Sequence, residues 1–174
     1  HMLRRQMLRS FRKPLIVMSP KSLLRSKDCR SHIADFTDGI FHGILDDPVP
    51  PSAPERVVFC TGKVYYDLVA YRREHPALAG STCILRIEQL YPLDEAEIRR
   101  LMDARCVGVR TMVWCQEEPG NMGAWSFIAP KLERITGMRP VYAGRKESAS
   151  PAVGSLALHK KEQAALVEAA FSVH

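Results

Sequence analysis

Short apolar runs recur along the chain, and from residue 57 onward they alternate with segments of helical periodicity. A continuous apolar run rich in β-branched residues indicates a strand buried on both faces, as in parallel sheets that helices cover on both sides. The pattern therefore predicts an α/β fold with three layers, helix–sheet–helix, around a mostly parallel five-stranded sheet. The five predicted strands are residues 14–18, 57–60, 83–88, 111–115 and 139–144.

Apolar positions three or four residues apart predict the helices. A short amphipathic helix is expected within residues 3–11, and longer helices are expected after Lys63, after Asn121 and after Gly154. The apolar positions that define the three longer helices are Val64, Leu68 and Tyr71; Met122, Trp125, Ile128, Leu132 and Ile135; and Ala164, Val167 and Phe171.

Two helix starts carry a capping signal. Asp94, followed three residues later by Glu97, predicts a capping box for a helix that should run to about Arg105. Asn121 is the expected cap of the next helix. Residues 46–54 contain four prolines, so this segment is predicted to be a linker or an extended surface loop.

Length and hydropathy narrow the class of protein. A chain of 174 residues that is 46% hydrophobic can bury a real core, which argues against disorder. No apolar run approaches the roughly 20 residues that a membrane-spanning helix needs, so no membrane association is expected.

The positive charge is concentrated near the amino-terminal end. The net charge is +6, but residues 1–27 hold eight basic side chains and no acid, which leaves residues 28–174 with a net charge of −2. The main body is therefore not expected to bind nucleic acid, and any anion-attracting surface belongs to the amino-terminal segment. A basic segment without acids is also typical of a mitochondrial transit peptide.

The cysteines and histidines do not suggest a metal site. Five cysteines stand at positions 29, 60, 83, 106 and 115 without a CxxC pair, and the six histidines form neither HxH nor HExxH. Cys60, Cys83 and Cys115 fall within predicted strands, so we expect buried, reduced thiols, which suit a reducing compartment.

Two adjacent acids, Glu117 and Glu118, follow the predicted strand 111–115. The carboxyl ends of strands are where open α/β sheets collect ligands, so the pair could be a general acid/base couple. Adjacent residues on an extended chain point apart, however. This favours a scaffold in which one acid pairs with a nearby base and the other is solvated.

Two further segments could attract phosphate. Residues 61–63, Thr-Gly-Lys, lie at a strand-to-helix turn, and residues 144–146, Gly-Arg-Lys, precede a loop of small residues at 147–155. An ordinary turn and an ordinary surface loop are the alternatives. No GxSxG elbow and no thiamine-diphosphate signature occurs in the sequence.

Five blocks, in order along the chain, are similar to a known family. The chain resembles the C-terminal domain of 2-oxoglutarate dehydrogenases, the thiamine-diphosphate-dependent component of a multienzyme complex. The resemblance spans essentially the whole chain and implies a transketolase-type C-terminal fold. The blocks are PLIVMSPKSLLR (14–25), VVFCTGKVYYDL (57–68), RIEQLYPL (86–93), VWCQEEPGNMGAW (113–125) and YAGRKESASPAVG (142–154).

The resemblance also implies a domain organisation. LRRQM, residues 3–7, is similar to the family's exit from the preceding pyrimidine-binding domain, which argues against a transit peptide. Residues 1–13 are therefore expected to be a basic lead-in, and residues 14–174 the transketolase-type domain. The chain departs from the family pattern at residues 26–29, SKDC, where relatives usually have His-Pro.

The resemblance implies that this chain is one piece of a longer, homodimeric enzyme of the tricarboxylic acid cycle. In the family, the full chain decarboxylates 2-oxoglutarate and succinylates the lipoyl group of a partner succinyltransferase. Thiamine diphosphate and Mg²⁺ bind in other domains, so no catalytic, cofactor-binding or metal-ligating residue is expected here. The compartment would be the mitochondrial matrix in a eukaryote and the cytoplasm in a bacterium.

Some family members bind AMP or acetyl-coenzyme A against this domain. We place the phosphates of such an effector at four residues that flank the first predicted strand, Arg12, Lys13, Lys21 and Arg25. The alternative is that these side chains pair with acids of neighbouring domains.

Three other functions remain open at this point. The chain could be the same domain of a 2-oxoadipate dehydrogenase, which shares the pattern at residues 116–123. It could also be a free-standing module that binds a nucleotide or acyl-coenzyme A, or a small flavodoxin-like enzyme.

Overall fold

The computed structural model describes residues 1–172, and its contacts divide into two compact units, His1–His42 and Gly43 onward. Residues 173–174, which include His174 and the end of the predicted domain 14–174, lie outside the described residues. The first unit contains α1 (Met2–Leu8), the 3₁₀ helix η1 (Lys21–Arg25) and α2 (Ile33–Thr37). The second contains β1 (Ile44–Leu45), β2 (Arg56–Cys60), α3 (Val64–Glu74), α4 (Pro76–Ala79), β3 (Thr82–Ile87), α5 (Glu95–Arg105), β4 (Thr111–Pro119), α6 (Trp125–Thr136), β5 (Val141–Arg145) and α7 (Leu156–Ser172).

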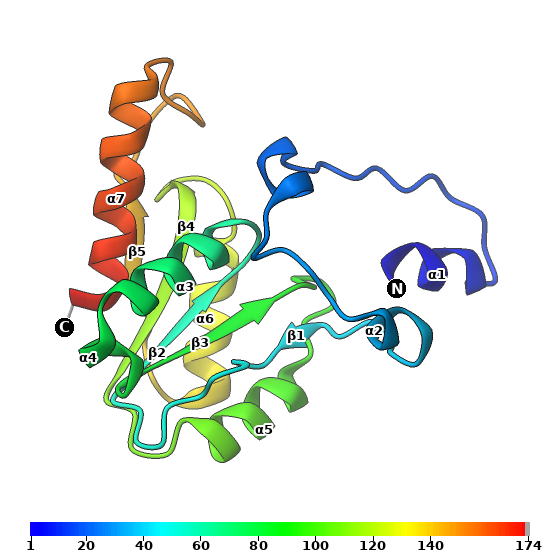
Figure 1. Cartoon of the computed structure of the whole chain (residues 1–174), viewed down its shortest axis with the longest axis horizontal. Helices are drawn as coiled ribbons and strands as arrows, with labels where there is room; N and C mark the ends of the chain where they lie inside the picture. Colours follow the sequence, from blue (N-terminus) through cyan, green and yellow to red (C-terminus); the bar gives the residue numbers. More distant parts are fainter. Residues whose placement is uncertain (173–174) are drawn as a thin grey trace. The chain divides into compact units, whose positions relative to one another are not determined.

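One five-stranded sheet organises the second unit, in the order β1-β3-β2-β4-β5 (Figure 1). The four strands β2 to β5 are parallel, and the short β1 pairs antiparallel with β3 at one edge. The central strand β2 pairs along its whole length with both neighbours, from Arg56 to Cys60. The predicted α/β class with a mostly parallel sheet is confirmed.

The side chains of β2 point alternately to the two faces of the sheet, and helices cover both faces, which gives three layers. Val57 and Phe59 pack into one apolar cluster with residues of α5 and α6, while Val58 and Cys60 pack into a second cluster with α3 and α7. Successive side chains of a strand point to opposite faces, so one central strand contributes to both clusters. In α3 and α6, the predicted apolar positions Val64, Leu68, Ile128, Leu132 and Ile135 are buried.

The strand predicted at residues 14–18 does not form. Its side chains are exposed, and the fifth strand of the sheet is instead the two-residue β1. The pattern of an apolar run is local, whereas a strand exists only where a partner strand accepts its hydrogen bonds. The predicted boundary after residue 13 stays a prediction; the contacts divide the chain between His42 and Gly43.

The predicted cap is present at the start of α5 but not at the start of α6. Asp94 accepts a hydrogen bond from the Glu97 amide at 3.0 Å, and α5 ends at Arg105 as expected. Asn121 does not cap α6, which begins at Trp125. The Asn121 side chain instead exchanges two hydrogen bonds with the main chain of Ser148, at 2.9 and 3.1 Å.

The apolar face of α7 is rotated slightly from the prediction. Val167 and Phe171 are buried as expected, but Ala164 is exposed and Leu166 is buried. Cys60, Cys83 and Cys115 are buried free thiols, as predicted. Among the described residues, no helix combines the length and the apolar character that crossing a membrane requires.

An ion pair inside the protein ties the proline-rich segment to the sheet. The Asp47 carboxylate accepts hydrogen bonds from Arg72 Nη1 (2.5 Å) and Nη2 (2.9 Å) of α3, and from the Ile84 amide of β3 (2.8 Å). The Asp47 side chain is 0% exposed. Burial acts to lower the pKa of Arg72, but the hydrogen bond and the charge of Asp47 outweigh it, so that pKa is raised.

Asp47 was not recognised in the sequence because it stands in a segment whose composition predicts a surface loop. Residues 46–54 form neither a helix nor a strand, so the prediction of a loop is confirmed. Only the folded arrangement brings α3 and β3 beside it.

We expect the substitution Asp47→Asn to lower the free energy of unfolding by about 3 kcal/mol, because it leaves the Arg72 guanidinium buried without a counter-charge. Urea denaturation of the purified chain measures this value. Asp46→Asn is the matched control: its partner Arg105 is at the surface, and the loss should stay below about 0.5 kcal/mol. Equal losses for the two variants would show that Asp47 has no special role.

Candidate functional site

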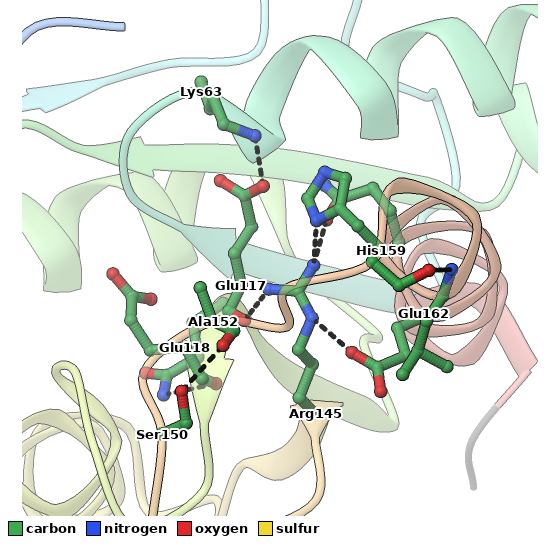
Figure 2. Close-up of polar contacts among 12 residues, drawn as sticks. Lys63, Glu117, Glu118, Arg145, Ser150, Ala152, His159 and Glu162 are labelled. Carbon is green, nitrogen blue, oxygen red and sulfur yellow. Dashed lines mark hydrogen bonds and ion pairs between the residues drawn. The ribbon is translucent and has the colours of Figure 1, made fainter.

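The carboxyl ends of the parallel strands meet at one edge of the sheet, where ligands collect in open α/β folds. Figure 2 shows the polar residues gathered there: Lys63 follows β2, Glu117 and Glu118 belong to the end of β4, and Arg145 ends β5. His159 and Glu162 approach them from α7. This cluster, called the strand-end cluster below, is the candidate site.

The paired acids lie within β4, which continues to Pro119, rather than just beyond its end. A register irregularity between Cys115 and Pro119 separates this last part from the regular pairing with β5. Glu117 forms an ion pair with Lys63, while the Glu118 side chain is exposed. The interpretation that one acid pairs with a base and the other is solvated agrees with these contacts.

Gln116 organises the turn that carries the acids. Its side chain is buried; Oε1 accepts a hydrogen bond from the Trp114 indole at 2.9 Å. Its Nε2 contacts the carbonyl oxygens of Glu118 (3.2 Å), Pro119 (3.2 Å) and Met122 (2.8 Å). One amide therefore bonds an indole N–H and three carbonyl oxygens. The Glu118 and Pro119 carbonyl groups have a second donor each, from the Tyr142 hydroxyl and the Met122 amide, so the Trp114 indole and the Met122 carbonyl depend most on Gln116.

Close packing around this amide requires glycine at position 123. Gly123 has φ +68°, and a Cβ there would lie 2.9 Å from both Gln116 Nε2 and Glu118 Cβ. Tyr142 supports the same turn, since its hydroxyl contacts the carbonyl oxygens of Glu118 (2.9 Å) and Arg145 (2.8 Å). Burial raises the pKa of Tyr142 to about 12, so the hydroxyl remains a donor at neutral pH.

Arg145 is held by partners on three sides. Its Nη1 donates to the Glu117 carbonyl oxygen (2.5 Å), and its Nη2 contacts His159 Nδ1 (3.1 Å) and Gln163 Oε1 (3.0 Å). Its Nε lies 3.0 Å from Glu162 Oε2, and the side chain is 10% exposed. Arg145 belongs to the segment 144–146 that could attract phosphate, but its guanidinium already bonds to residues of β4 and α7.

A cavity of about 470 Å³ lies beside this arginine, between α7 and the loop that follows β5. Its walls are mostly apolar. The polar lining residues are Arg145, Lys146, Glu147, Ser148, Ser150 and Glu162. Ser150 Oγ donates to the Ala152 carbonyl oxygen at 2.7 Å and so shapes the loop that covers it. The apolar lining residues are Pro119, Pro151, Ala152, Val153, Ala165, Leu166 and Ala169.

The arginine near the end of β3, Arg86, is also held by neighbouring side chains. Arg86 stacks over the Tyr65 ring, with the guanidinium carbon 4.4 Å from the ring centroid, and its Nε lies 2.6 Å from Glu88. Burial acts to lower the pKa of Arg86, but the charge of Glu88 and the hydrogen bond to Tyr66 outweigh it and raise that pKa. Most of the charged side chains at the strand ends therefore bind one another and fix the loops there, whereas Glu118 is exposed.

The four predicted effector residues all belong to the first unit and all are exposed. Arg12 and Lys13 line a shallow hollow together with Phe11, and the Lys13 ammonium lies 5.5 Å from the Phe11 ring centroid. Lys21 and Arg25 stand at the two ends of η1 and do not line that hollow. The structure thus brings together only the two that are adjacent in sequence, and the phosphate site remains a prediction.

The sequence analysis missed His159 and Glu162 of this cluster, and it also missed Gln116, which supports the turn beside it. A signal was available, since a polar amide directly after the apolar run 111–115 and before two acids is unusual for a buried strand. Its hydrogen-bond partners were not deducible, because the indole and the carbonyl groups come together only when the turn folds back.

Comparison with known proteins identifies close relatives of the sequence. A model of the family "2-oxoglutarate dehydrogenase C-terminal" matches residues 30–171. The chain is 47% identical to the 2-oxoglutarate dehydrogenase E1 component of Cupriavidus necator and 43% identical to that of Azotobacter vinelandii; each alignment covers 99% of this chain and 18% and 19% of the relative, respectively. A mitochondrial 2-oxoglutarate dehydrogenase of Caenorhabditis briggsae is 42% identical, over 99% of this chain and 17% of the relative. The chain thus spans less than a fifth of the length of these curated relatives.

Among solved structures, the chain is similar to one described as "Split gene transketolase, inactive beta4 tetramer". The TM-score is 0.51 at 17% sequence identity, and the match covers 69% of this chain and 39% of the other. At this identity the likeness concerns the fold alone, and it confirms the predicted transketolase-type architecture.

We expect Gln116→Met to lower the free energy of unfolding by about 3 kcal/mol, because a side chain of similar volume leaves the Trp114 indole and the Met122 carbonyl without the hydrogen bonds that Gln116 makes to them. Asn121→Ala is the control, since Asn121 is exposed and bonds only the Ser148 main chain; its loss should be about 0.5 kcal/mol. Chemical denaturation, with the indole fluorescence as the readout, compares the two variants. A loss for Gln116→Met no larger than that of the control would contradict the role assigned to the amide.

Proposed function

The chain belongs to the 2-oxoglutarate dehydrogenase C-terminal family. We propose that it is the non-catalytic C-terminal part of a 2-oxoglutarate dehydrogenase. The full polypeptide would decarboxylate 2-oxoglutarate oxidatively and succinylate the lipoyl group of a partner succinyltransferase, in the tricarboxylic acid cycle. The observation that supports this most directly is the match over 99% of the chain to E1 components more than five times its length.

The strand-end cluster supports a structural role for the domain. Lys63 is paired with Glu117, and Arg145 with Glu162, while Gln116 holds the turn between β4 and α6. These contacts give the carboxyl edge of the sheet a fixed shape. A fixed edge suits a domain that buttresses neighbouring domains and a homodimer, which is the role we assign to it.

Thiamine diphosphate and Mg²⁺, which the family implies, do not fit the described residues. Residues 1–172 contain no group of three or more His, Cys, Asp or Glu side chains that could hold a metal ion. Glu117, one of the two carboxylates at the end of β4, forms an ion pair with Lys63. We therefore assign the cofactor to the part of the polypeptide outside this chain.

A second proposal concerns regulation. Arg12, Lys13, Lys21 and Arg25 would bind the phosphates of an effector such as AMP or acetyl-coenzyme A. Two observations favour this: residues 1–27 carry eight basic side chains and no acid, and the hollow lined by Arg12 and Lys13 includes an aromatic ring on which an adenine could lie.

The compartment follows from the source of the polypeptide. The relatives include bacterial enzymes and one named as mitochondrial. We propose the cytoplasm for a bacterial host and the mitochondrial matrix for a eukaryotic one. The five free cysteines suit either reducing compartment. A 2-oxoadipate dehydrogenase remains the alternative for the substrate.

The 174-residue chain should bind neither thiamine diphosphate nor 2-oxoglutarate in isothermal titration calorimetry, because the proposal places both sites elsewhere. The full-length polypeptide, titrated under the same conditions with Mg²⁺, should bind the cofactor and turn over 2-oxoglutarate faster than 2-oxoadipate. Micromolar binding of either ligand to the 174-residue chain, or a full-length enzyme inactive on both keto acids, would contradict the proposal.

For the effector site, we expect AMP or acetyl-coenzyme A to shift amide resonances near residues 12–25. Lys13→Ala or Lys21→Ala should weaken binding roughly threefold to fivefold, the loss expected for one exposed ion pair. Lys161→Ala on α7 is the control, since it removes an exposed lysine far along the sequence and should leave the affinity unchanged. A titration without shifts in residues 12–25, or equal weakening by all three variants, would end the effector proposal.

A further inference from the structure

Residues 14–18, Pro-Leu-Ile-Val-Met, form an apolar segment that the described residues leave uncovered. Leu15 is 39% exposed, Ile16 82%, Val17 52% and Met18 91%. The whole unit His1–His42 contains no buried residue, and it holds 13 of the 19 large apolar side chains that are exposed in the described chain. A segment with so much exposed apolar surface marks a contact with another structure.

The same chain shows what such a run does when it has partners. Val57–Cys60 has the same pattern, with apolar residues at consecutive positions, and its side chains are 0% exposed within β2. Consecutive apolar residues, rather than alternating ones, indicate a strand covered on both faces. By this comparison, residues 15–18 are expected to be an inner strand of a helix-covered sheet.

The backbone of the segment is also available for pairing. Residues 14–18 form no helix or strand, and no main-chain hydrogen bond of Leu15, Ile16, Val17 or Met18 occurs within the described chain. Pro14 and Pro20 bracket the run, and Pro14 would sit at the first position of the strand, where a missing amide donor is tolerated. Unpaired N–H and C=O groups beside apolar side chains are what a strand offers to a neighbouring sheet.

The comparisons indicate where that sheet lies. The family model begins at residue 30, so residues 14–18 fall outside the C-terminal family domain. The alignments to the E1 components nevertheless include them, since they cover 99% of this chain and only 17–19% of each relative. The segment therefore belongs to the family's long polypeptide but not to its last domain.

We propose that residues 14–18 form an inner strand of a second parallel sheet, supplied by the rest of the same full-length polypeptide. This inference rests on the proposed function, because it requires the longer chain. Burying the run would place Lys13 at one end of the strand and Lys21 beyond the other, where they meet the surface of the neighbouring domain. The first 29 residues would then be structurally part of that domain, and the C-terminal domain would begin after them.

Hydrogen exchange on the full-length enzyme tests the proposal without any substitution. The amides of Ile16, Val17 and Met18 should exchange roughly 100-fold more slowly in the full-length enzyme than in the 174-residue chain, because strand pairing protects them. Amides of β2 should be protected in both and serve as the internal reference. Equally rapid exchange of residues 16–18 in the two proteins would overturn the proposal.

Two substitutions in the full-length enzyme test whether the strand is an inner one. Neighbouring side chains point to opposite faces, so Ile16→Asp and Val17→Asp should each lower the thermal midpoint by several degrees. Val107→Asp is the matched control, because Val107 is 73% exposed in the second unit and should leave the midpoint unchanged. If only one of the two variants is destabilised, the strand has a solvent face and the inner position is wrong.

The remaining outcomes separate this inference from the proposed function. Turnover of 2-oxoglutarate by the unsubstituted full-length enzyme tests the function alone, whereas exchange of residues 16–18 tests the strand alone. Sedimentation of the 174-residue chain identifies the other possible partner. A dimer of that chain with slow exchange at residues 16–18 would show that a second copy covers the segment, and would overturn the assignment to the same polypeptide.

Discussion

The second unit depends on burying both faces of three parallel strands. Nearly every side chain of β2, β3 and the first part of β4, up to Cys115, is buried. Those on one face pack against α5 and α6, and those on the other face pack against α3 and α7. Apolar burial is the dominant favourable contribution to folding, and it is not directional. It requires helices on both faces but leaves the loops between strands and helices undetermined. Specific polar contacts decide those loops.

Those polar contacts are concentrated at the two ends of the strands. At the amino-terminal side, Asp47 links a loop to α3 and β3 through Arg72 and the Ile84 amide. At the carboxyl edge, Gln116 and Arg145 link the turn after β4 to β5 and α7. In each case a buried polar side chain satisfies main-chain groups from several elements, so that no single partner can move independently. These contacts hold the side chains in fixed positions at the carboxyl edge of the sheet, where ligands collect in open α/β folds.

The first unit follows a different rule. It has the apolar content to be buried but no buried residue, and its positive charge has few acids of its own. Local interactions still shape it: Arg5 lies over the Phe41 ring at 3.7 Å, and Arg4 donates to the Phe36 carbonyl oxygen at 2.7 Å. Such contacts position a few side chains but cannot replace a core. We propose above that its exposed strand-like run meets another part of a longer polypeptide and that four of its basic residues bind the phosphates of an effector.

Elements whose signals are local could be predicted from the sequence. The apolar runs at residues 57–60 and 111–115, the capping pair Asp94 and Glu97, and the helical periodicity after Lys63 each predicted the observed element, because each signal lies within one element. The five ordered blocks likewise predicted the family. Only the folded chain reveals that residues 14–18 remain unpaired among the described residues and that Asp47 is buried against Arg72. A strand needs a partner strand, and a buried charge needs a counter-charge, and neither partner can be identified from the residues that are adjacent in sequence.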